Sequence, residues 1–211
     1  MRRGSLAAGI GAVAFAVLPV IGMFLANPPG GSYSVHDSVK YAAKGHHTAV
    51  FVSVYFVLAG AIGLVVLLSR LRESIGGRFA SVFWGLGVGG AAVYVAGYAL
   101  VAALPVALTY GGANSGLTTT PSLTYILSES GWAIMFGAGC TLIGAALVTF
   151  AFASPIVPAW VRWTALVAGI CGIASVAWFP YFVMALWALV IGVWLIAADR
   201  GTVGATAPQP A

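Results

Sequence analysis

The sequence predicts an all-α polytopic membrane protein: a bundle of six transmembrane helices with both termini in the cytoplasm. Two observations lead to this prediction. Of the 211 residues, 61% are hydrophobic and only 6% are charged, and the hydrophobic residues form long runs separated by short polar segments. Soluble domains carry roughly 25% charged residues, so this chain has too little charge to cover a globule in water. Lipid is therefore the expected solvent.

Six runs approach the length of about 20 apolar residues that a transmembrane helix needs. Within a single domain, residues 1–200, we predict spans at residues 6–26, 48–69, 79–108, 121–152, 160–177 and 181–198. The first run is too long for a signal-peptide core of about 7–15 residues. The third is long enough to tilt or to kink near Pro105. Residues 201–211 lack apolar residues for packing and are predicted to form a disordered cytoplasmic tail.

The loop after the first run contains a helix-start signal. Ser34 stands three residues before Asp37, which is a loose capping-box pattern. We therefore predict a short helix from Val35 toward Lys44, with Gly45 as a kink before the second span. Between the last two spans, the tight hinge at residues 178–180 makes those spans antiparallel neighbours.

Basic residues set the predicted orientation. With the N-terminus in the cytoplasm, seven arginines face inward and two lysines face outward: Arg2, Arg3, Arg70, Arg72, Arg78, Arg162 and Arg200 against Lys40 and Lys44. The positive-inside rule thus predicts this orientation. Richness in alanine, glycine and valine, with arginine above lysine on the inner side, is typical of a high-GC bacterium, so we expect its cytoplasmic (inner) membrane. The net charge of +5 does not indicate nucleic-acid binding, because the basic residues stand at the ends of apolar runs instead of on one face.

Small residues predict where helices approach each other. Gly85 and Gly89 form a GxxxG pair in the third run, and Ala59, Gly63, Gly137, Gly139 and Gly144 line small faces in the second and fourth. Small residues let helix backbones come close in lipid. We expect the GxxxG pair to pack inside the bundle, with self-association through Gly85 and Gly89 as the alternative.

Ionisable residues gather on the predicted outer side of the membrane. This group contains all three histidines of the chain, and its members are His36, Asp37, Lys40, Lys44, His46, His47 and Glu129. The functional hypothesis is an outward-facing polar site for a metal ion, a lipid headgroup or a small polar ligand, with Glu129 beneath the two adjacent histidines. A metal is disfavoured because the recognised zinc spacings are absent. The structural alternative is a wet loop with ordinary polar residues.

Glu129 is the most informative single residue. Thr120 and Pro121 fit an N-cap and a first helical position, so the fourth helix is predicted to begin there. Glu129 then lies about two turns inside it, with Tyr125 and Trp132 on the same face. An ionisable residue within the membrane is a functional candidate by default, whereas a carboxylate near a helix N-terminus is the structural alternative. Binding at this face would need a cavity lined by Tyr41, Tyr125 and Trp132.

Other chemistry lacks its motif. The chain has no HExxH, CxxC, GxSxG or phosphate-binding loop. Haem b would need histidines inside the membrane, and the last four predicted spans have none. Cys140 and Cys171 lie inside apolar runs and are predicted to be packing residues. We predict no catalytic residue, no metal and no cofactor.

Three segments suggest a family. They are LSRLR at residues 68–72, SGW at 130–132 and PAWVRW at 158–163. With the helix pattern of residues 44–198, they resemble uncharacterised actinobacterial integral membrane proteins of the DUF4386-like kind. The resemblance implies six helices and transfers no catalytic residue.

The favoured function is a non-enzymatic helical bundle that binds a ligand, a lipid or a partner protein from its outer face. A small transporter or channel subunit is one alternative, which an internal three-plus-three repeat would indicate. An intramembrane enzyme is the other, and it needs Glu129 within about 3 Å of His46 or His47 for acid–base chemistry.

Overall fold

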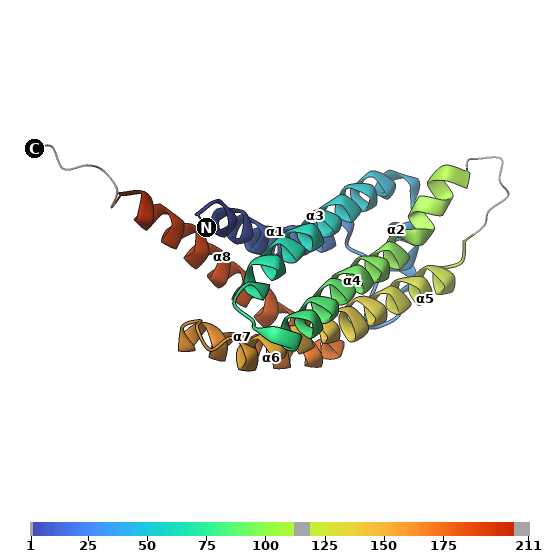
Figure 1. Ribbon diagram of the computed structural model, residues 1–211. Helices are drawn as coiled ribbons and strands as arrows, with labels where there is room; N and C mark the ends of the chain where they lie inside the picture. The colour runs from blue at the N-terminus through green and yellow to red at the C-terminus, as the bar shows by residue number, and fades with distance from the viewer. Residues whose placement is uncertain (1, 112–118, 205–211) are drawn as a thin grey trace, which may run out of the picture.

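The computed structural model describes residues 2–111 and 119–204, which contain helices and no strand (Figure 1). The elements are α1 (Arg2–Ala26), α2 (Val35–Ala42), the 3-10 helix η1 (Lys44–His46), α3 (His47–Arg72), α4 (Gly77–Gly111), α5 (Pro121–Trp132), the π-helix η2 (Ala133–Gly139), α6 (Cys140–Ala153), α7 (Ala159–Ile173), the 3-10 helix η3 (Ala174–Ala177) and α8 (Pro180–Gly204). The all-α fold class is confirmed.

Six helical segments in the described residues are long and apolar enough to cross a membrane. They are α1, η1 with α3, α4, α5 through α6, α7 with η3, and α8. The chain is therefore an integral membrane protein of six spans. The predicted helix starts are also observed, since Ser34 accepts a hydrogen bond from Asp37 N–H and Thr120 accepts one from Leu123 N–H. Of the predicted tail, residues 201–204 continue α8, and residues 205–211 lie outside the described residues.

Each span packs against the spans before and after it in the chain, and α1 also packs against α8. The six spans therefore close into a ring in sequence order. Large aromatic side chains fill its interior: Phe15, Tyr94, Tyr98, Phe136 and Tyr181 are all at most 2% exposed. Tyr94 and Tyr181 join their hydroxyls at 2.9 Å, so a polar contact links α4 to α8 inside the ring.

Glycines bring neighbouring helices into backbone contact. A Cβ atom built on Gly11 would lie 2.5 Å from the Gly63 carbonyl oxygen, and one on Gly144 would lie 2.5 Å from that of Gly169. Both separations are too short for a real side chain, so only glycine fits at these crossings of α1 with α3 and of α6 with α7. The small faces predicted at Gly63 and Gly144 are confirmed, as is that of Gly139, which lies against Tyr94.

The packing predicted inside the bundle for Gly85 and Gly89 is wrong. No described atom lies within 4 Å of a Cβ built on either residue, because Gly87 faces α3 instead. Gly137 makes only an ordinary contact and Ala59 is exposed. Self-association through Gly85 and Gly89 stays a prediction.

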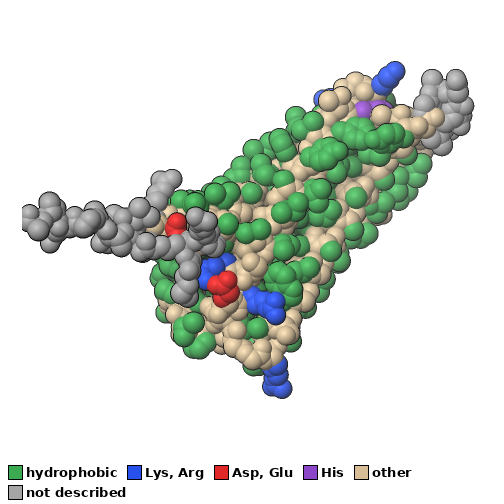
Figure 2. Space-filling view, turned by 45° about the horizontal axis from the view of Figure 1, so that its top comes forward, with side chains coloured by type: hydrophobic (Ala, Val, Ile, Leu, Met, Phe, Trp, Pro, Cys, Tyr) green, Lys and Arg blue, Asp and Glu red, His purple; other side chains and the backbone are tan. Residues whose placement is uncertain are grey.

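The two ends of the bundle differ in their charged residues. We call the end with Arg70, Arg72, Arg78 and Arg162 the arginine end, and the end with His36, His46 and His47 the histidine end. Figure 2 shows a largely apolar band between these polar ends, as a bilayer requires. The positive-inside rule predicts the arginine end to be cytoplasmic.

Candidate functional site

Glu129 and Tyr125 hold one loop in place. This loop, residues 27–34 between α1 and α2, is called the strap below. The Glu129 carboxylate accepts a hydrogen bond from Gly31 N–H, and the Tyr125 hydroxyl donates one to the Gly31 carbonyl. Tyr33 also packs edge-on against Tyr125, with ring centroids 5.2 Å apart. Gly31 has a φ of +75°, which favours glycine. Two of the three predicted ligand residues on α5, Tyr125 and Glu129, therefore fasten the strap to the bundle.

The three histidines have separate partners. His46 Nε2 bonds to the Ala26 carbonyl, and His47 bonds to the Ala42 carbonyl at 3.1 Å and to Thr109 Oγ1 at 2.7 Å. Since the Ala42 carbonyl only accepts, Nε2 of His47 carries a proton. No three acidic, histidine or cysteine side chains among the described residues lie close enough to hold a metal ion.

The remaining polar candidates lie on the surface of the histidine end. His36 and Asp37 pair at 3.2 Å, and both side chains are mostly exposed. Hydrogen bonds from His36 and then from Ser34 lower the pKa of the Asp37 carboxyl below its usual value. Lys44 is exposed as well. Binding of a polar ligand by Lys44 and the three histidines stays a prediction.

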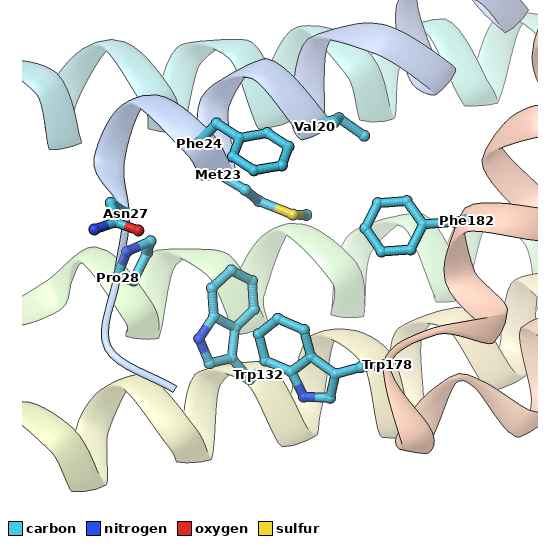
Figure 3. Close-up of a pocket in the computed structure, with 8 residues that line it drawn as sticks. All are labelled: Val20, Met23, Phe24, Asn27, Pro28, Trp132, Trp178 and Phe182. Atoms are coloured by element: carbon cyan, nitrogen blue, oxygen red, sulfur yellow. The ribbon is translucent and has the colours of Figure 1, made fainter. Parts of the chain in front are cut away.

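A cavity of about 170 Å³ lies beside the strap (Figure 3). Eight residues line it: Val20, Met23 and Phe24 of α1, Asn27 and Pro28 of the strap, Trp132 of α5, Trp178 of the hinge and Phe182 of α8. Helices α1 and α8 are in backbone contact at Gly9 and Gly192, toward the arginine end. The cavity lies near their opposite ends.

Exposure shows which side of the cavity faces lipid. Phe24 is 78% exposed and Phe182 is 47% exposed, whereas Trp132 is 2% exposed. The indole of Trp132 therefore closes the cavity toward the bundle interior, and the two phenylalanines border an opening between α1 and α8. Phe24 and Phe182 belong to membrane spans, so the opening lies on the outer surface of the bundle, near the histidine end.

Backbone strain is concentrated at this cavity. Asn27, with φ of 41°, and Trp178, with φ of 68°, are the non-glycine residues with positive φ in the described chain, and both line the cavity. Asn27 ends α1 with a hydrogen bond from its N–H to the Met23 carbonyl, a place where asparagine is tolerated. Trp178, with ψ of −60°, is the central residue of a γ-turn in which Phe179 N–H donates a hydrogen bond to the Ala177 carbonyl at 2.8 Å. A γ-turn with positive φ is rare and strained, and a strained backbone conformation of this kind costs about 1–3 kcal/mol. Strain of this kind persists at functional sites.

The aromatic walls continue into the bundle through a π-helix. η2 begins directly after Trp132. π-Helical turns are rare in proteins, and those that occur are often at functional sites. Its residue Phe136 stacks on Trp132 at 5.4 Å between centroids and contacts Trp178 at 5.0 Å and Tyr181 at 5.1 Å. Displacement of any one of these rings would therefore change the packing of the others.

The strap lies directly on the Trp132 indole. A Cβ built on Gly30 would lie 3.2 Å from Trp132 Nε1 and 3.5 Å from a Glu129 carboxylate oxygen. This nitrogen is buried and has no hydrogen-bond partner among the described residues. A buried donor without an acceptor is costly, and such atoms in native proteins call for an explanation.

No protein-family model, no curated protein and no solved structure matches this chain. The DUF4386-like resemblance stays a prediction. The function must therefore be argued from the site.

The observed cavity differs from the one expected from the sequence. Trp132 lines it, but Tyr125 fastens the strap, and Tyr41 is buried and donates a hydrogen bond to the Val101 carbonyl at 3.0 Å. Sequence reasoning missed the residues contributed by α1 and α8. The sequence predicts the hinge at residues 178–180 only as a tight turn. Its adjacent aromatic residues, Trp178 and Phe179, are the signal that could have pointed to an aromatic cavity wall there.

Proposed function

We propose that this integral membrane protein binds a small apolar ligand, or the apolar end of a lipid-like molecule, in the cavity beside the strap. The observation that supports the proposal best is the lining. It is almost wholly aromatic and aliphatic, and it includes no ionisable side chain. Its polar side-chain groups are the Asn27 amide and the indole N–H groups of Trp132 and Trp178. A few placed polar groups in an apolar wall are typical of ligand pockets.

The volume limits the size of the ligand. Drug-sized pockets occupy roughly 300–1,000 Å³, and the cavity is only about 170 Å³. An apolar cavity of about 150 Å³ in another protein accepts benzene. The proposed guest is therefore a single ring or a short piece of one chain, and any larger part of the molecule would extend through the opening between α1 and α8.

Ligand binding explains the strain better than the enzyme alternative does. An acid–base enzyme needs an ionisable group at the site, and Glu129 is hydrogen-bonded to the strap. A binding cavity instead needs walls held in place. Trp178, at the centre of the strained γ-turn, directs its indole onto Trp132, with centroids 4.8 Å apart. As part of the proposal, the cavity opens in the outer leaflet of a bacterial cytoplasmic membrane.

Toluene is a suitable probe because its single ring matches the cavity volume. We expect it to raise the thermal unfolding midpoint of the purified protein in detergent, since a ligand at 100 times its Kd stabilises the folded state by about 2.7 kcal/mol. Val20→Trp fills the cavity and should abolish the rise. Ile21→Trp is the matched control, because Ile21 is 45% exposed and does not line the cavity.

A wild-type protein with no rise in midpoint would contradict the proposal. An equal rise in the Val20→Trp variant would contradict it as well, because toluene would then act through the detergent or through another surface. If Val20→Trp does not fold, Met23→Trp blocks the same cavity from the next turn of α1.

A further inference from the structure

A second crevice lies at the arginine end, away from the cavity beside the strap. It has a volume of about 320 Å³ between α4 and α6, and its lining residues are Phe79, Val82, Val148, Thr149, Phe152 and Ala153. The hydroxyl of Thr149 is engaged with the Ala145 carbonyl at 2.9 Å. Phe79 and Val82 are each 49% exposed and Phe152 is 70% exposed. The crevice is thus apolar and open to lipid.

A guanidinium group stands at the edge of this crevice. The Arg78 Cζ atom lies 5.4 Å from the centroid of the Phe79 ring, which is part of the lining. On the far side of Phe152, Arg162 Nε donates to the Ala151 carbonyl at 3.0 Å. Glu73, an acid at this end, pairs with Arg70. Two cations therefore flank the apolar side chains of α4 and α6.

We propose that the crevice binds an anionic phospholipid from the leaflet at the arginine end. One acyl chain lies between α4 and α6, and the phosphate contacts the guanidinium of Arg78. Arginine suits this contact because its planar group can bind phosphate through two parallel hydrogen bonds. Basic pockets between transmembrane helices are typical binding places for anionic headgroups. The site is independent of the proposed ligand cavity.

Charge also makes a second copy of the chain a poor occupant. On α4, Arg78 lies 7 and 11 residues before Gly85 and Gly89, so the three share one helix face. A second copy docking in parallel on the two glycines would bring two Arg78 side chains toward each other. Like charges at that position repel, whereas a phosphate is attracted. The lipid therefore complements this face and an identical helix does not.

Native mass spectrometry of the full chain can test the proposal. The protein is released from nanodiscs of phosphatidylcholine with a minor fraction of phosphatidylglycerol, and the retained lipid is identified. We expect phosphatidylglycerol to be enriched over its share in the nanodisc. Arg78→Gln should reduce this enrichment about fivefold, which corresponds to one arginine near the surface. Arg72→Gln is the matched control, because its guanidinium lies over Trp84 and not over the crevice.

The outcomes separate the possibilities. Equal losses in the Arg78→Gln and Arg72→Gln variants would indicate general attraction to the basic end and would overturn the proposal. A dimer that retains no phospholipid would overturn it too, because a second copy would then cover the face. Val82→Trp, at a residue that is 49% exposed, fills the crevice and leaves Arg78 intact, so it should reduce retention of both lipids. Unchanged retention in this variant would contradict an acyl chain in the crevice.

Discussion

Gly144 and Gly89 provide a pair of alanine substitutions with opposite expected signs. At the crossing of α6 with α7, a Cβ on residue 144 would lie 2.5 Å from the Gly169 carbonyl oxygen and 2.7 Å from Ile173 N. Both atoms belong to the backbone and cannot rotate away. Ordinary contact begins near 3.4 Å, so the two helices must separate by about 0.9 Å, the difference between 3.4 and 2.5 Å.

The magnitudes follow from two opposing effects. Overpacking of this kind costs about 1–3 kcal/mol, and the higher helix propensity of alanine returns up to about 1 kcal/mol. Taken together, the two ranges predict that Gly144→Ala lowers the free energy of unfolding by up to about 3 kcal/mol. At Gly89 no described atom lies within 4 Å of the new Cβ, so Gly89→Ala should leave stability unchanged or raise it by up to about 1 kcal/mol.

Reversible unfolding in mixed micelles of dodecylmaltoside and sodium dodecyl sulfate, followed by circular dichroism, measures both free energies. The wild-type protein and the two variants are compared at the same detergent composition. If Gly144→Ala proved as stable as Gly89→Ala, the backbone contact between α6 and α7 would not exist in the folded protein, and the packing argument would be refuted.

Two further substitutions test hydrogen bonds described above. Tyr125→Phe removes a donor to the Gly31 carbonyl, which should cost about 0.5–1.5 kcal/mol locally. Amide exchange in the strap, measured by mass spectrometry, should then be up to about tenfold faster, and an unchanged rate would show that Tyr125 does not hold the strap. Tyr98→Phe removes the 2.8 Å hydrogen bond to Ser53 inside the membrane. Such bonds average about 0.6 kcal/mol, so a loss above about 2 kcal/mol in the same micelle assay would contradict a simple pair.

The fold was largely predictable from the sequence because lipid imposes a length and a composition on each span. All six predicted spans coincide with observed segments, with end points that differ by at most six residues. Helix-capping residues were also reliable signals, since Ser34 and Thr120 cap the N-termini of helices as expected. In both cases the deciding interactions lie within a few residues of each other in the chain.

The candidate site was predictable only in part. Trp132 was chosen for its position on the face of Glu129, and it does line the cavity. For Glu129 the sequence leaves a functional and a structural role open. In the structure it accepts a hydrogen bond from Gly31, which is 98 residues away in sequence. The cavity also forms only because the first and last spans pack against each other. The residues next to Val20 or Phe182 in the sequence do not indicate this contact.

The sequence by itself determined that lipid surrounds the chain, how many times the chain crosses, and which residues lie at each end. Only the tertiary structure decided which face of each helix is buried. It placed Gly87 against α3 and left Gly85 and Gly89 on the outside. In water, apolar residues that recur about every three or four positions mark the buried face of a helix. In lipid both faces are apolar, so the choice depends on how closely whole helices can pack.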